Sequence, residues 1–70
     1  MEGFIKLKVA KHEELMINVN HLVYYEPVEY NVPDGIHRGS SIMLVGNHRI
    51  EVWENVSEIN SKISDLKKSN

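Results

Sequence analysis

The sequence contains no cysteine, so no disulfide can staple this 70-residue chain. A domain of this size buries only about 60% of the surface that its unfolded chain exposes, which leaves a thin margin of stability. No apolar run approaches the roughly 20 residues that a membrane-spanning helix requires, and the first residues lack the pattern of a signal peptide. We therefore expect a single cytoplasmic domain over residues 1–70, with no membrane partner.

A large excess of either sign of charge is also lacking, because 8 Lys and Arg residues stand against 10 Asp and Glu residues. A net charge of −2 creates no strong field that would attract nucleic acid or anionic lipid. The 41% apolar and 26% charged residues are typical of an ordinary globular protein. Small domains often need extra stabilisation, so we expect a homo-oligomer, with a well-packed monomer as the alternative.

Motifs for catalysis and cofactor binding are missing. The chain has neither a glycine-rich phosphate loop nor the Gly-x-Ser-x-Gly turn of a nucleophile elbow. Its four histidines, His12, His21, His37 and His48, lack the close spacings of metal ligands, and no thiolate is available to them. We interpret them as solvated turn residues. We expect a protein that is not an enzyme, with no catalytic, cofactor-binding or metal site.

Alternation of apolar and polar residues predicts a first hairpin between residues 4–9 and 15–19. One register places all six alternating apolar side chains on a single face and leaves 10–14 as a polar loop. The pairs in this register are Val9 with Leu15, Leu7 with Ile17, and Ile5 with Val19. The asparagines within residues 18–21 then favour a turn.

Three further strands are predicted at residues 22–26, 41–45 and 49–53. The last two form a hairpin with a three-residue loop at 46–48, which pairs Leu44 with Ile50 and Ile42 with Val52. A two-residue loop would instead set aliphatic against charged residues. We expect Asn47 or His48 to adopt the left-handed backbone conformation, which asparagine tolerates best.

The segment 27–39 has two alternative interpretations. Pro33, Asp34 and Gly35 form a strong turn signal. Pairing Val32 with Ile36, and then Tyr30 with Arg38, would extend the hairpin past the sheet as a projecting arm. Pro27 and two glycines are equally compatible with an irregular loop.

A helix is predicted over about residues 56–67. Asn55 and Glu58 fit a variant of the capping box, and Lys67 and Lys68 suit the C-terminal end of the helix dipole. Its apolar stripe consists of Val56, Ile59, Ile63 and Leu66. The predicted fold class is mainly β, a four- to five-stranded antiparallel bent sheet of order β-β-β-β-β-α, with the helix across its apolar face.

This order of elements resembles the small FlbD-like flagellar and swarming proteins of bacteria, and other small β-rich proteins of bacterial genomes and mobile elements. The matching segments are 4–7, 17–20 and 50–59. The resemblance implies a bacterial, non-enzymatic accessory protein and supplies no catalytic residues. The long segment 27–39 and the turn at 46–48 depart from the family pattern.

Protein interaction is the function that we predict from the exposed aromatic residues. Trp53 is out of phase with Ile50 and Val52, so it should lie on the outer face, or alternatively fold over the edge of the sheet toward the helix. The candidate partner-binding residues are Tyr30, Val32, Ile36, His37, Arg38 and Trp53. We expect a regulatory or interaction module that self-associates through a sheet edge or through 27–39.

Nucleic-acid binding is the alternative function. Lys6, Lys8 and Lys11 would form a basic surface near aromatic residues, which is how single strands are bound on sheets. Lysines on an outer strand also serve to prevent edge-to-edge aggregation. The excess of acidic over basic residues favours this second interpretation.

Overall fold

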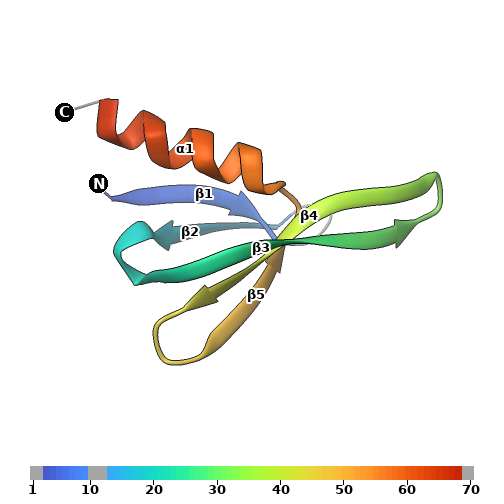
Figure 1. Cartoon of the computed structure of the whole chain (residues 1–70), viewed down its shortest axis with the longest axis horizontal. Coiled ribbons are helices and arrows are strands. Elements are labelled where there is room, and N and C mark those ends of the chain that lie inside the picture. The colour runs from blue at the N-terminus through green and yellow to red at the C-terminus, as the bar shows by residue number, and fades with distance from the viewer. Residues whose placement is uncertain (1–2, 10–12, 69–70) are drawn as a thin grey trace.

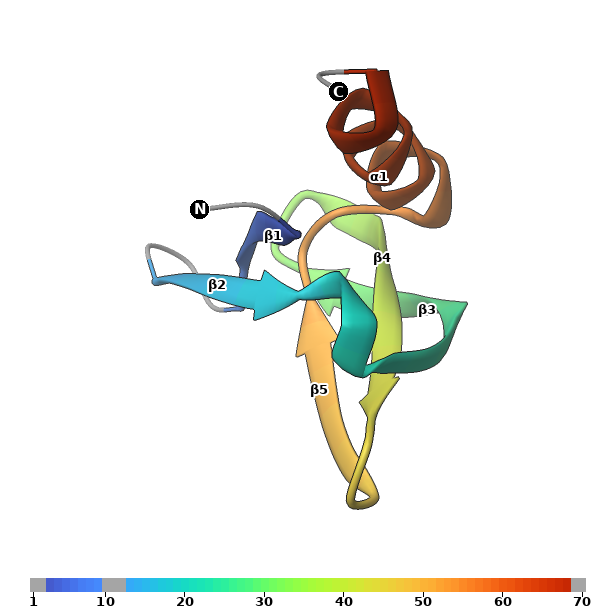
Figure 2. The same cartoon turned by 90° about the vertical axis from the view of Figure 1, so that its left-hand side faces the viewer.

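The computed structural model describes residues 3–9 and 13–68, and it confirms a mainly β fold that ends in one helix (Figure 1). The elements are β1 (Phe4–Lys8), β2 (Glu14–Asn18), the short 3-10 helix η1 (Val19–His21), β3 (Leu22–Val32), β4 (Gly35–Leu44), β5 (His48–Val52) and α1 (Val56–Lys68). All strand pairs are antiparallel, and they form two sheets, β1-β2 and β3-β4-β5, instead of one. Figure 2 shows β2 running at a steep angle to β4 and β5, with α1 on one side.

The predicted pairing of the first hairpin is wrong by two residues. Ile5 lies opposite Ile17 and Leu7 opposite Leu15, whereas the predicted partners were Val19 and Ile17. A shift of two leaves every side chain on its predicted face, which is why the alternation could not distinguish the registers. Val19 is not in the strand, because Asn18 accepts a hydrogen bond from the Asn20 N–H at 3.0 Å and starts η1.

The segment 27–39 is a hairpin arm in the structure, formed by the outer halves of β3 and β4, and it projects beyond the rest of the molecule (Figure 1). Its register differs by one residue from the predicted one. Gly35, at a φ of 135°, already pairs with Val32, so the turn holds only two residues. Tyr30 therefore lies opposite His37 and not Arg38. A shift of one exchanges the faces, and this decides which side chains meet.

The last hairpin has the predicted three-residue loop, but the loop begins one residue earlier. It spans 45–47, so Leu44 pairs with His48 and Ile42 with Ile50. Asn47 has a φ of 62°, which confirms the expected left-handed residue. Gly46 also has a positive φ, 87°, and glycine adopts this conformation without steric cost.

The apolar faces of both hairpins and of the helix share one interior, as predicted. Its buried members are Ile5, Leu7, Ile17, Ile42, Val52 and Ile59. Partly buried side chains that pack against them include Leu44, Ile50, Ile63 and Leu66. Leu15 differs from this set, because it lies on the inward face of β2 yet remains 38% exposed.

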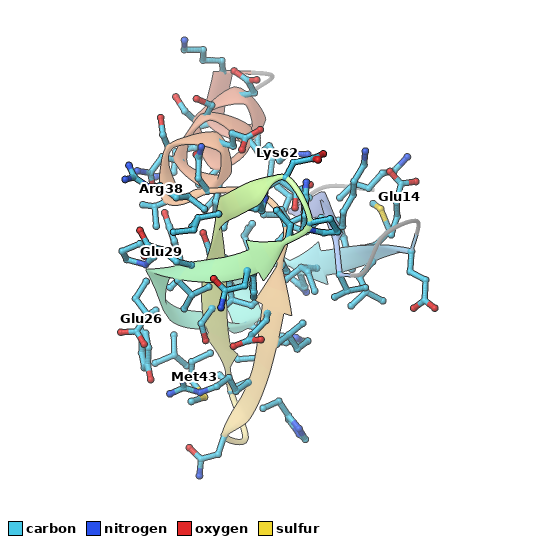
Figure 3. All side chains as sticks on the ribbon, turned by 90° about the vertical axis from the view of Figure 1, so that its right-hand side faces the viewer. Glu14, Glu26, Glu29, Arg38, Met43 and Lys62 are labelled. Carbon is cyan, nitrogen blue, oxygen red and sulfur yellow. The ribbon has the colours of Figure 1, made fainter. Side chains whose placement is uncertain are left out.

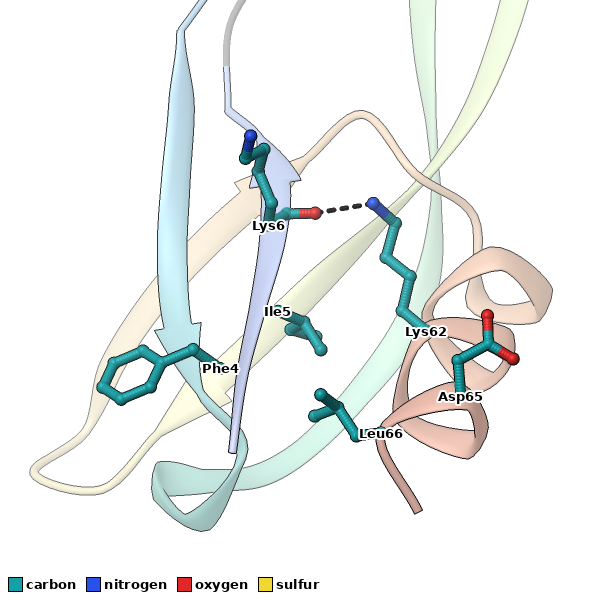
Figure 4. Close-up of a pocket in the computed structure, with 6 residues that line it drawn as sticks. All are labelled: Phe4, Ile5, Lys6, Lys62, Asp65 and Leu66. Carbon is teal, nitrogen blue, oxygen red and sulfur yellow. Dashed lines mark hydrogen bonds between the residues drawn. The ribbon is translucent and has the colours of Figure 1, made fainter. Parts of the chain in front are cut away.

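Glu54, in the link between β5 and α1, connects the two sheets. Both of its carboxylate oxygens accept the backbone N–H of Lys8, at 2.9 and 3.1 Å, although the residue is only 8% exposed. The backbone N–H of the preceding residue, Trp53, donates to the Lys8 carbonyl at 2.7 Å. Lys62 on α1 donates to the Lys6 carbonyl at 2.7 Å (Figure 4). Side chains and backbone from the link and the helix thus cover the outer edge of β1.

The helix begins at the predicted cap. The side chain of Asn55 accepts the Glu58 N–H at 2.8 Å, and the side chain of Glu58 accepts the Asn55 N–H at 3.0 Å. This reciprocal pair is a capping box, and it satisfies two backbone donors that the first turn leaves free. Farther along, the Tyr25 hydroxyl donates to the side-chain oxygen of Asn60 and ties α1 to β3.

We predict that Glu54→Ala lowers the free energy of unfolding by about 2 kcal/mol, because it leaves the part-buried Lys8 N–H without an acceptor. Urea denaturation followed by circular dichroism measures this loss. Glu29→Ala is the control: its ion pair with Arg38, at 3.5 Å, joins side chains that are 60% and 80% exposed, so we expect a change below about 0.5 kcal/mol. Equal losses for the two variants would contradict the assigned role of Glu54.

Candidate functional site

Three aromatic rings from three parts of the chain meet on the outer face of the three-stranded sheet. Tyr30 comes from β3, His37 from the opposite position on β4, and Trp53 directly follows β5. We call these three residues the aromatic platform. Residues opposite one another in an antiparallel pair share a face, so the observed register is what places Tyr30 beside His37.

The platform rings are nearly parallel. The His37 ring stacks on Trp53 with centroids 3.4 Å apart and planes at 10°. The Tyr30 ring lies 6.3 Å from His37 and 6.2 Å from Trp53, at angles of 13° and 6°. His37 Nε2 also lies 2.7 Å from the Trp53 backbone oxygen. Stacking and this polar contact together fix the indole against the arm.

Gly39 of β4 makes room for the platform. A Cβ at this position would lie 2.4 Å from the Val52 carbonyl oxygen and 2.7 Å from the Tyr30 ring. The Tyr30 ring therefore lies directly over the glycine, and its hydroxyl donates over long distances to the Val52 and Ser40 carbonyls, at 3.3 and 3.4 Å. Burial, and secondarily the negative charge of Glu51, raise the pKa of Tyr30 above its ordinary value. The hydroxyl thus keeps its proton at neutral pH and remains a donor.

A shallow groove of about 280 Å³ runs beside the platform. Its lining residues are Val9, Tyr30, Asn31, Val32, Glu51, Val52 and Trp53. Most of these side chains are apolar or aromatic, with a single carboxylate at Glu51. The groove offers an apolar contact surface whose walls are held by the sheet.

The structure brings four of the six predicted partner-binding residues together and separates two. Val32 lines the groove together with Tyr30 and Trp53, and His37 stacks on Trp53. Ile36 and Arg38 point to the opposite face of the arm because they alternate with His37 along β4. Ile36 is 63% exposed, and Arg38 forms its ion pair with Glu29 on that face (Figure 3).

Of the two predicted positions of Trp53, the structure has the outer-face one. The side chain is 39% exposed and stacks on the arm, while its backbone N–H bonds to β1. The sequence interpretation missed Gly39 and the carboxylate of Glu54. A glycine inside a strand is a usable signal of close backbone approach. Glu54 gave no such signal, because its acceptor role depends on Lys8, which is 46 residues away in the chain.

The described part of the chain contains no group of side chains that could bind a metal ion. Within residues 3–9 and 13–68, no three His, Asp or Glu side chains lie close enough to hold an ion. Of the histidines, His21 lies in η1, His48 begins β5 and His37 belongs to the platform, while His12 lies outside the described residues. In the same ranges no helix is long and apolar enough to cross a membrane.

The predicted basic surface is only partly described, since Lys11 also lies outside the described residues. Lys6 and Lys8 are exposed on the outward face of β1. Lys6 lies opposite Met16 and Lys8 opposite Glu14, so a carboxylate offsets one of the two charges. Phe4 shares this face by alternation, and Figure 4 shows its ring directed away from the helix.

Comparisons with known proteins found no matching family model, no matching curated protein and no matching solved structure. The resemblance to the FlbD-like proteins therefore stays a prediction from the strand and cap pattern.

We predict that Gly39→Ala destabilises the fold by about 3 kcal/mol, because the added methyl group meets a backbone oxygen that cannot move freely. The same variant should displace Tyr30 and expose the indole, which red-shifts the fluorescence of the single tryptophan. Thermal denaturation and emission spectra measure the two effects. Ser64→Ala, on the exposed side of α1, is the control and should change neither. An unchanged spectrum and stability in Gly39→Ala would show that the platform does not depend on this close approach.

Proposed function

We propose that this chain is a non-catalytic protein-interaction module, which binds a partner chain through the aromatic platform and also self-associates. The observation that carries the proposal is the half-exposed Trp53, held in one orientation by His37 beside an apolar groove. Aromatic anchors of this kind supply most of the binding energy in protein interfaces.

The rigidity of the platform supports this use. A side chain that must be immobilised on binding costs about 0.5–1.5 kcal/mol of conformational entropy. The Trp53 indole is already stacked, and the Tyr30 hydroxyl is already bonded to the β4 and β5 backbone. Because these rings are already ordered, binding of a partner would cost less conformational entropy.

The shape of the groove favours an extended peptide or loop as the element that the partner inserts. Val32 and Trp53 supply apolar walls, and Glu51 supplies one negative charge at the side. A segment with an apolar side chain followed by a basic one would satisfy both features. We therefore propose a partner segment of mixed apolar and basic character.

Panning a random peptide library against the immobilised protein tests the proposal. We expect enriched peptides that carry apolar and basic residues and that lose at least about tenfold in affinity, or about 1.4 kcal/mol, against Trp53→Leu. Tyr24→Leu is the matched control, because Tyr24 is another outward-facing aromatic of the same sheet, 43% exposed against 39% for Trp53. Enriched peptides that bind Trp53→Leu and the wild type equally would place the contact surface elsewhere. The absence of any enrichment would count against the function.

Nucleic-acid binding is retained as a second candidate because Phe4, Lys6 and Lys8 share one face of β1. An aromatic ring next to lysines is suited to stacking a base beside a neutralised phosphate. Fluorescence anisotropy with labelled single- and double-stranded oligonucleotides over a salt series separates the two functions. We expect no salt-sensitive binding, because the net charge is −2 and Glu14 offsets Lys8.

Tight binding that falls steeply with salt would contradict that expectation. The surface is then assigned by Lys6→Gln with Lys8→Gln, compared with Lys67→Gln and Lys68→Gln at the end of the helix. Loss in the first pair alone would establish β1 as the nucleic-acid surface.

A further inference from the structure

We infer that the outer edge of β2 pairs with β2 of a second copy, antiparallel about a two-fold axis at Met16, to form a continuous four-stranded sheet. This inference rests on the self-association in the proposed function and names the surface that performs it. It differs from the aromatic platform, whose residues all lie on other strands.

The hydrogen bonds beside β2 show which of its backbone groups face outward. Val9 donates to the Glu13 carbonyl at 2.9 Å, and Val19 donates to the Gly3 carbonyl at 2.7 Å. In the observed register these odd-numbered residues continue the bonded pairs of the ladder. Bonded and non-bonded pairs alternate, so the N–H and C=O of Met16 point away from β1. In the described part of the chain β2 pairs with β1 alone.

The outer edge of β1 is closed to a partner strand. The Lys8 N–H is taken by the Glu54 carboxylate and the Lys8 carbonyl by the Trp53 N–H. The Lys6 carbonyl accepts the Lys62 ammonium group. Charged side chains and a crossing backbone are the usual means by which proteins block such edges.

The edges of the three-stranded sheet are unsuited to pairing with their own copy. The Trp53 N–H donates outward from β5, so by alternation its neighbour Val52 bonds inward to Ser40 of β4. Ser40 therefore forms no bonded pair with Pro27, its partner on β3, and the backbone nitrogen of Pro27 lies on the outer edge of β3. Proline has no N–H to offer a partner strand. The outer edge of β5 is already met by β1, because the N–H of Trp53, directly after β5, donates outward to the Lys8 carbonyl.

The β2 edge is complementary to itself. A two-fold axis at Met16 lets the two Met16 residues exchange both N–H···O bonds, with Glu14 opposite Asn18 of the second copy. No like charges meet in this register. On the inward face, Leu15 comes to lie opposite Ile17 of the second copy, which would cover a side chain that is 38% exposed in one chain. Met16, 48% exposed, would be covered on the other face.

Sedimentation velocity over a concentration series tests the inference with the full chain. We expect a monomer–dimer equilibrium in the wild type. Met16→Pro removes the outward N–H but no bond to β1, so it should raise the dimer dissociation constant at least about tenfold while the circular dichroism spectrum is retained. Met16→Leu keeps both the N–H and the apolar side chain, and it should dimerise like the wild type.

Met16→Glu provides a second variant that leaves the backbone unchanged, in case proline disturbs the strand. Within one chain the new carboxylate lies opposite Lys6, so the β1-β2 pair gains an opposite-charge neighbour. At the axis it sets two carboxylates against each other and should weaken the dimer at least about tenfold, with partial recovery at high salt. A wild type that stays monomeric at its highest soluble concentration would refute self-association altogether. A dimer that is unaffected by Met16→Glu, and by Met16→Pro in folded form, would refute the β2 edge alone.

Discussion

The bond between the Glu54 carboxylate and the Lys8 backbone is the constraint on which the rest of the structure depends. The two-stranded sheet β1-β2 is not stable alone, because an isolated hairpin is marginal in water. The contact at Lys8 fixes the end of β1 against the end of β5 and so closes the shared interior. It also sets the direction in which the chain leaves β5. Trp53 then faces the arm, and Asn55 caps the helix.

The alternation of apolar and polar residues along the strands determined how much of the fold could be predicted. Alternation fixes which face a side chain occupies, so the interior containing Leu7, Ile42 and Ile59 was largely foreseeable. It does not distinguish registers that differ by two residues, and both β1-β2 and β4-β5 were predicted with that error. The backbone at Asn18 and at the 45–47 turn decided these registers. Such choices depend on local hydrogen bonds that a hydrophobic pattern does not contain.

The candidate site lies where the predicted register was wrong by one residue, an error that exchanges the two faces of a strand. In the arm the predicted register was off by one, because the turn includes Pro33 and Asp34 but not Gly35. That single residue moves His37, in place of Arg38, to the face of Tyr30 and makes the stack with Trp53 possible. The phase of Trp53 relative to its strand was readable from the sequence. Its ring partner was not, since that depended on the geometry of a turn that ends 19 residues earlier in the chain.

The position of the helix and of the link after β5 explains why one strand edge of the first sheet is covered and the other is not. Within the first sheet, the helix and the link after β5 meet the outer edge of β1, so Glu54 and Lys62 cover that edge and leave the β2 edge on the far side of β1. Covering the β2 edge as well would require a further helix or strand. A chain of 70 residues offers little surface against which such an element could be buried. The second copy that we infer at the β2 edge would supply that element without lengthening the chain. In this protein, self-association and stability would then share one cause: the limited number of backbone groups that a single small domain can satisfy.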